Sequence, residues 1–267
     1  MAKAPSRDGS RHALVVATAR YTDSAFRQLR APAQDAADVV EVLADPAIGR
    51  FSVTSVLDRP EYEIRRTIAS FLHERRVDDL VLIYLSCHGV LDARGNLFLA
   101  AADTIKEQPW ATAVDSAWLQ DRLEECRARR QVVIVDSCFS GAFGKAKGAG
   151  NELELDRRLL GSGRGRAVLT ASRATEYSFE GDPLPGLVTG GSVFTAALVD
   201  GIRSGDADRD GDGLITVDDA FHYAADQMNK AGSAQTPQRT ITNSEGEIVL
   251  NRPEFVVHPP CQFSRIP

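Results

Sequence analysis

The sequence has no run of about 18 apolar residues, so no membrane-spanning helix is expected. Its first residues, MAKAPSRDGSRH, are polar and lack the apolar core of a secretory signal. An excess of basic residues is also missing: 31 lysines and arginines stand against 37 aspartates and glutamates, a formal net charge of −6. This balance argues against a nucleic-acid partner and against binding to a membrane surface.

Cysteine is scarce, and its pattern indicates neither a disulfide framework nor a metal site. Four thiols lie far apart in the sequence: Cys87, Cys126, Cys138 and Cys261. This pattern suits a reducing compartment, and we expect a cytoplasmic protein. With 267 residues, of which 43% are hydrophobic, the chain can form a substantial core.

Apolar strand-like segments alternate with segments of helical periodicity along most of the chain. Strands are predicted at 12–17, 51–57, 79–86, 131–135 and 166–171, and the segment GEIVL at 246–250 is expected to close the sheet. Helices are predicted at 33–43, 59–74, 116–130, 192–203 and 217–229. Because strands alternate with helices, the sequence predicts an α/β protein with a mainly parallel sheet. The continuous apolar character of the strands predicts that helices cover both faces.

The segment 144–165 interrupts this pattern. It reads GKAKGAGNELELDRRLLGSGRG, is rich in glycine and charge, and predicts a mobile loop. We therefore expect a flexible N-terminal tail over 1–10, one α/β domain over 11–252 that contains this loop, and a C-terminal tail over 253–267.

Two of the predicted strands are followed by chemically active residues, His88 after one and Cys138 after the other. Ligands bind beyond the carboxyl ends of parallel strands, so adjacent strand ends would place both residues at the same edge of the sheet. An imidazole accepts the proton of a neighbouring thiol, which is only partly ionised at neutral pH. The sequence therefore predicts Cys138 as a nucleophile and His88 as its general base. The backbone N–H groups of Gly89 and Cys138 are candidates for an oxyanion hole.

Inert cysteines and structural histidines are commoner than catalytic ones, and we assign Cys126 and Cys261 to the inert class. The motif Asp-Ser-Cys-Phe-Ser-Gly around Cys138, with His88 50 residues upstream, favours catalysis.

The same motifs resemble the caspase and metacaspase clan of cysteine peptidases. The similar segments are YLSCHG at 84–89, VIVDSCFSG at 133–141, VLTASRATEYSFE at 168–180, GSVFTAALVDGI at 191–202 and QTPQ at 235–238. The last two also fit prokaryotic members, the metacaspase-like orthocaspases. The resemblance extends over about 12–250 and implies a caspase-like α/β/α sandwich with a mainly parallel central sheet. It also implies a Cys138–His88 dyad with oxyanion donors at Gly89 and Cys138.

Cys87 departs from the family pattern, which usually has glycine before the histidine. We interpret it as a small tolerated residue; redox interference beside the site is the alternative.

The resemblance also bears on specificity. Caspases cleave after aspartate, using arginines in the first specificity pocket, whereas metacaspases and paracaspases cleave after arginine or lysine, using acidic residues. The family's acids match Asp136 and Asp35, which implies protein or peptide substrates with a basic residue at the cleavage site. A carboxylate pairs well with a guanidinium. For Asp35 the alternative is a helix-start charge that the macrodipole stabilises, and Asp38 competes for the role.

The segment DRDGDGLITVDD at 208–219 matches a calcium-binding EF-hand loop at its acidic and glycine positions. Its candidate ligands are Asp208, Asp210, Asp212 and Asp219, and the last replaces the usual glutamate. The alternative is a solvated turn that caps the following helix. Ca²⁺ is thus a candidate ligand, although the peptidase chemistry requires no cofactor.

Proteolysis concentrates in exposed loops, and the 144–165 loop holds several basic residues. In related peptidases a cut in this region separates a large piece from a small one. The sequence therefore suggests a zymogen cleaved at Arg157 or Arg158, by itself or by an upstream activating peptidase; the alternative is a linker that is never cut.

Taken together, these features predict a cysteine endopeptidase that cleaves after arginine or lysine. The alternatives are a catalytically silent caspase-like binding module and a calcium-responsive regulatory protein.

Overall fold

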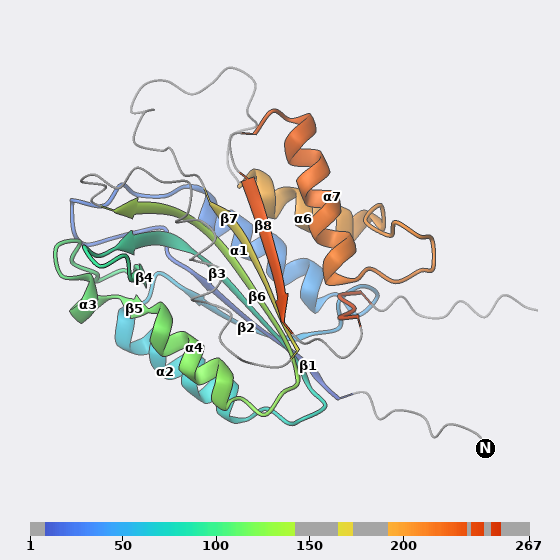
Figure 1. Ribbon diagram of the computed structural model, residues 1–267, viewed down its shortest axis with the longest axis horizontal. Helices are drawn as coiled ribbons and strands as arrows, with labels where there is room; N and C mark the ends of the chain where they lie inside the picture. The colour runs from blue at the N-terminus through green and yellow to red at the C-terminus, as the bar shows by residue number, and fades with distance from the viewer. Residues whose placement is uncertain (1–8, 142–164, 173–191, 234–235, 243–246, 252–267) are drawn as a thin grey trace, which may run out of the picture.

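The computed structural model describes residues 9–141, 165–172, 192–233, 236–242 and 247–251. A sheet of eight strands forms its centre (Figure 1), with six strands in the order β2-β1-β3-β6-β7-β8. The first five of these are parallel, and β8 runs antiparallel to β7. The six strands are β1 (Arg11–Ala17), β2 (Ser52–Leu57), β3 (Leu80–Leu91), β6 (Arg130–Gly141), β7 (Arg166–Ser172) and β8 (Thr236–Thr242).

Two short strands extend the sheet at the carboxyl end of β3. They are β4 (Leu97–Leu99), which pairs antiparallel with β3, and β5 (Val114–Asp115), which pairs with β4. The helices are α1 (Ala31–Ala44), α2 (Glu61–His73), α3 (Pro109–Thr112), α4 (Ser116–Glu125), α6 (Val193–Ser204) and α7 (Val217–Lys230).

The helices lie in two layers, one on each face of the sheet. In Figure 1, α1, α6 and α7 cover one face, and α2 and α4 cover the other. Strand side chains alternate between these layers, because successive residues of a strand point to opposite faces. In β3, Leu82 and Tyr84 pack with the α1 layer, whereas Ile83 and Leu85 pack with the α2 layer. The predicted α/β/α sandwich with a mainly parallel sheet is therefore confirmed.

Two expectations about strands require correction. β3 and β6 do not end at residues 86 and 135 but continue through His88 and Cys138 to Leu91 and Gly141, because the two strands pair with each other along this length. The segment 246–250 does not close the sheet. Its described part makes an isolated bridge from Val249 to Thr216, and β8 takes the edge position beside β7.

Among the described residues, no helix has both the length and the apolar character needed to cross a membrane. The expected tails and most of the 144–165 loop lie outside the described residues.

Candidate active site

The candidate dyad lies on two neighbouring strands in exact register. Cys138 of β6 is paired with His88 of β3, and the preceding pairs on the same face are Ser86 with Asp136 and Tyr84 with Ile134. Adjacent strands in a sheet are about 4.8 Å apart. The register therefore places the backbones of His88 and Cys138 at neighbouring positions.

The segment that follows β1 fixes the His88 imidazole. His88 Nε2 lies 2.8 Å from the carbonyl oxygen of Arg27. Since a carbonyl only accepts hydrogen bonds, Nε2 carries the proton, and the basic nitrogen of the neutral ring is Nδ1. The ring centroid also lies 5.0 Å from that of Tyr21 and 5.5 Å from that of Phe26. His88 is 8% exposed, so these contacts hold it in one orientation.

Tyr21 also fixes the backbone at this position. Its hydroxyl accepts a hydrogen bond from the His88 backbone N–H at 3.0 Å and donates one to the Thr18 carbonyl at 2.9 Å. On the other side, the His88 carbonyl accepts from the Ala100 N–H at 2.9 Å. The sequence motifs did not indicate Tyr21, Phe26 or Arg27. The one available signal is that they follow β1, whose carboxyl end lies at the same edge of the sheet.

Gly89, the expected oxyanion donor beside His88, lies in β3 between two strands. It is paired with Phe139 of β6 and with Leu99 of β4. This position is next to the dyad, as an oxyanion donor would require.

The two candidate specificity acids are buried side by side on the α1 face of the sheet. Asp35, from α1, is 2% exposed, and Asp136, from β6, is 7% exposed. Burial and then the neighbouring charge of Asp136 raise the pKa of Asp35 to about 7. Both carboxylates receive hydrogen bonds from the start of α6: the Ser192 N–H donates to Asp35 at 3.1 Å, and the Thr195 hydroxyl donates to Asp136 at 2.6 Å.

The competing acid, Asp38, is only half-buried and accepts a hydrogen bond from Gln34 on the same helix. Asp35 is not a charge of the first helical turn, which contains no acidic residue. The structure thus brings Asp35, rather than Asp38, beside Asp136.

The acid pair lies deeper in the sheet than the dyad. Asp136 precedes Cys138 by two residues, which corresponds to roughly 7 Å along a strand, and both positions lie on one face. A group held at the dyad therefore needs a long side chain to reach the carboxylates.

Cys87 lies on the opposite face from His88, within the core formed with α2 and α4. It is a free cysteine, and burial raises the pKa of its thiol to about 12. A thiol that stays protonated at neutral pH is a poor nucleophile, which favours the interpretation of Cys87 as a small tolerated residue.

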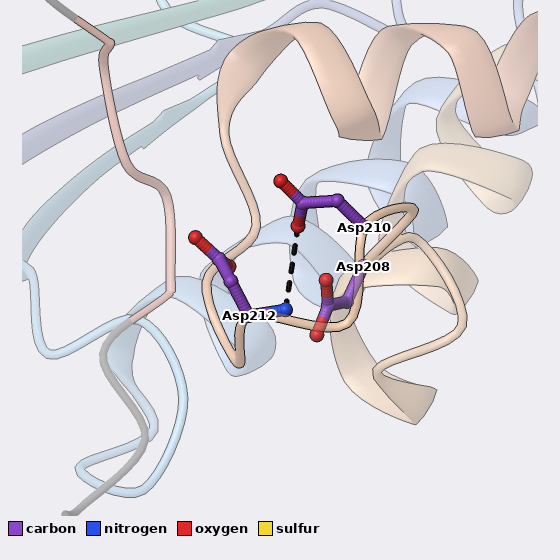
Figure 2. A group of neighbouring side chains, drawn as sticks. All are labelled: Asp208, Asp210 and Asp212. Carbon is purple, nitrogen blue, oxygen red and sulfur yellow. Dashed lines mark hydrogen bonds between the residues drawn. The ribbon is translucent and has the colours of Figure 1, made fainter.

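The acidic loop before α7 brings together three of its four candidate ligands (Figure 2). One carboxylate oxygen from each of Asp208, Asp210 and Asp212 lies within 4.8 Å of the others. Asp219 is used differently: its Oδ2 accepts from the Thr216 N–H at 3.0 Å and from the Thr216 hydroxyl at 2.6 Å, in a capping box at the start of α7. The helix-capping role weighed for this segment is therefore present at Asp219.

The proposed cleavage residues, Arg157 and Arg158, lie outside the described residues.

No protein-family model matches this chain, and no curated protein matches it either. Several solved structures match it in fold. A protein of Geobacter sulfurreducens has a TM-score of 0.61 at 16% identity, covering 92% of this chain and 98% of its own. The structure of pro-sf-caspase-1 has a TM-score of 0.61 at 13% identity, covering 91% of each chain. Caspase-1 from Spodoptera frugiperda has a TM-score of 0.59 at 14% identity, covering 93% of this chain and 92% of its own.

The chain has a caspase-like fold. At these identities the likeness is one of fold, and the chemistry must be argued from the residues of the site.

The raised pKa of Asp35 predicts a specific effect of pH on stability. In the folded protein Asp35 holds a proton that the unfolded chain releases between about pH 4 and pH 7, so the free energy of unfolding of the wild type falls as pH rises through this window. Asp35→Asn removes this loss because the amide does not ionise. Chemical denaturation from pH 5 to pH 8 should show the variant gaining stability relative to wild type. The exposed Asp121→Asn on α4 is the control; a difference between Asp35→Asn and wild type that stays constant with pH would contradict the prediction.

Proposed function

We propose that this chain is a cysteine endopeptidase with Cys138 as nucleophile and His88 as general base. The observation that carries the proposal is the register that pairs Cys138 with His88, whose Nε2 is committed to the Arg27 carbonyl. That commitment makes Nδ1 the basic nitrogen of the ring. A fixed, correctly protonated base beside a thiol is the arrangement that thiol catalysis requires.

In the proposed reaction, His88 Nδ1 takes the proton of the Cys138 thiol, and the thiolate attacks the carbonyl carbon of the scissile peptide bond. The oxyanion forms beside the backbone N–H groups of Gly89 and Cys138. When the tetrahedral intermediate collapses, the C–N bond breaks and the His88 imidazolium gives its proton to the leaving amine. Water then hydrolyses the thioester, with His88 again accepting a proton, and the free thiol is restored.

We further propose that the residue before the scissile bond is arginine or lysine. The support is a pair of buried carboxylates: Asp136 precedes Cys138 by two residues on the same face of the sheet, and Asp35 of α1 lies beside Asp136. Two adjacent buried acids are costly, as the raised pKa of Asp35 indicates, and a cationic side chain between them offsets that cost. An aspartyl side chain would instead be repelled. This acidic pocket corresponds to the specificity described above for metacaspases and paracaspases, not for caspases.

The proposal predicts that Cys138→Ala and His88→Ala each lose about 10³-fold or more in kcat/KM on arginyl peptides, and that the double variant is little worse because the two residues act as a unit. Asp136→Asn should raise KM for arginyl substrates about tenfold or more, since it removes a charge-assisted contact. Fluorogenic peptides with arginine, lysine or aspartate before the scissile bond measure these effects, with Cys126→Ala as the control. Retained activity in Cys138→Ala would refute the catalytic assignment, and a preference for aspartate would refute the specificity. Wild-type protein that cleaves none of the peptides would favour a silent caspase-like binding module.

A second candidate function, calcium regulation, is favoured by the convergence of Asp208, Asp210 and Asp212 in the acidic loop. Hard cations prefer such carboxylate oxygens. If the loop binds Ca²⁺, millimolar calcium should raise the melting temperature of the wild type through linkage but not that of Asp210→Asn. Asp206→Asn, an acidic residue outside the group, is the matched control. Isothermal calorimetry without heat, together with an unchanged melting temperature, would remove the loop as a metal site.

We also propose that the peptidase is a zymogen cleaved after Arg157 or Arg158, by itself or by an upstream peptidase. The support is the match between the basic residues of this loop and the acidic pocket. Intact-mass measurement should show two fragments in wild-type protein and a single chain in Cys138→Ala if cleavage is autocatalytic. Identical masses would leave only the upstream peptidase. Unchanged activity of the Arg157→Ala, Arg158→Ala double variant under an activating stimulus would show that a cut at this pair has no regulatory role.

A further inference from the structure

A chain of buried hydroxyl groups lies behind the acid pair, and the catalytic assignment does not use it. The Thr195 hydroxyl of α6 lies 2.6 Å from Asp136 Oδ2, and the Tyr84 hydroxyl of β3 lies 2.9 Å from the same Thr195 oxygen. Tyr84 is fully buried, and Thr195 is 1% exposed. Protein contacts rather than water therefore set the directions of these hydrogen bonds.

The number of protons available on these groups fixes which group donates in each hydrogen bond. An ionised carboxylate only accepts hydrogen bonds, and a hydroxyl has a single proton to donate. Since Thr195 donates to Asp136, its oxygen must accept from Tyr84. This arrangement needs a neutral phenol, and burial followed by the charges of Asp136 and Asp35 raises the pKa of Tyr84 well above 10. The chain is thus polarised from Tyr84 through Thr195 toward Asp136.

We propose that Thr195 and Tyr84 are positioning residues for substrate specificity, which hold Asp136 ionised and in one orientation so that it receives a basic side chain. This inference rests on the proposed function, because it concerns the specificity pocket of that peptidase. It adds two residues, one on β3 and one on α6, to the acids that touch the substrate.

The two carboxylates are held by unequal donors. Asp136 receives a short hydrogen bond from the polarised hydroxyl chain, whereas Asp35 receives longer ones, 3.1 and 3.2 Å, from the Ser192 backbone N–H. Adjacent buried acids do not ionise equally, and donors to the charged form decide which one is ionised first. The shorter donor therefore favours ionisation of Asp136 before that of Asp35, and Asp35, with its pKa of about 7, keeps its proton while no cation is bound.

A basic substrate side chain stabilises the ionised form of Asp35, so binding releases its proton. Among the residues that the structure describes, the charged groups that raise the pKa of Asp35 are Asp136 from β6 and Asp38 from its own helix, and Asp35 in turn raises the pKa of Tyr84 of β3. KM for arginyl substrates should therefore fall as pH rises through about 7. Removing the Thr195 hydroxyl, one donor to Asp136, raises the pKa of the pair and moves this transition to higher pH.

The test compares arginyl peptides with citrullinyl peptides, which have nearly the same shape but no charge. Thr195→Val, which keeps the shape but loses the hydroxyl, should raise KM for the arginyl peptide about tenfold, equivalent to about 1.4 kcal/mol, with little change in kcat. The kcat/KM of Thr195→Val for the citrullinyl peptide should equal that of the wild type. Thr195→Ser should restore wild-type KM. Tyr84→Phe should raise arginyl KM to a smaller extent because it weakens the chain one bond further away.

Matched controls remove the same groups elsewhere. Thr67→Val deletes a hydroxyl on α2, across the sheet, and Tyr62→Phe deletes a phenol at the surface. Both should leave the ratio of arginyl to citrullinyl kcat/KM and its dependence on pH unchanged. Carboxyl NMR titration of ¹³C-aspartate protein, assigned with Asp35→Asn and Asp136→Asn, gives a readout that does not depend on turnover. It should show the Asp136 titration moved to higher pH in Thr195→Val.

Normal arginyl cleavage with an unchanged ratio and an unchanged Asp136 titration in Thr195→Val would overturn this inference and leave the proposed function in place. Wild-type protein that cleaves citrullinyl and arginyl peptides equally, or neither, would overturn the proposed specificity and this inference with it. If Thr195→Val does not fold, Tyr84→Phe carries the same comparison. The same two results in that variant, an unchanged ratio and an unchanged titration, would overturn the inference.

Discussion

The register between β3 and β6 sets the relative positions of His88, Cys138 and Asp136. It pairs His88 with Cys138 and Ser86 with Asp136, all on the face covered by α1 and α6. A slip of one residue would turn the β6 positions to the other face, because strand side chains alternate. Asp136 would then enter the apolar core beside α2 and α4 and lose the hydroxyl of Thr195. Burying a carboxylate without donors is costly, so Asp136, to which the proposal assigns substrate specificity, also opposes the wrong register.

This arrangement places charge inside an otherwise apolar layer. The neighbouring strand positions, among them Leu82, Tyr84 and Ile134, are buried and pack against α1, α6 and α7. Two acids are tolerated there because the start of α6 donates a hydrogen bond to each of them. Burial and then the charge of Asp136 destabilise the ionised form of Asp35, as its raised pKa indicates. Natural proteins accept such a loss of stability where a binding site requires it.

The neighbouring positions of His88 and Cys138 could be predicted from sequence because both residues come directly after strongly apolar segments, although β3 and β6 extend beyond them. Tyr21 could not be predicted, because it lies in an irregular segment and reaches His88 only through tertiary packing. The closing strand was assigned to 246–250 because that segment is apolar. The true edge strand, β8, contains Pro237 and an arginine, which an edge strand tolerates but a sequence pattern does not favour. The loop motif likewise indicated four carboxylate ligands, whereas the start of α7 engages one of them in its capping box.

The central claim is that Cys138 is the reactive thiol and that His88 activates it within a pocket for a basic side chain. An arginyl chloromethyl ketone tests both parts of the claim, because its guanidinium should bind the acid pair and its chloromethyl carbon should alkylate the thiolate. Incubation with the full chain, followed by peptide mapping, should give a single adduct on Cys138. Free arginine derivatives should protect against labelling, and His88→Ala should slow it strongly. No adduct, or labelling of Cys87, Cys126 or Cys261 in place of Cys138, would contradict the claim.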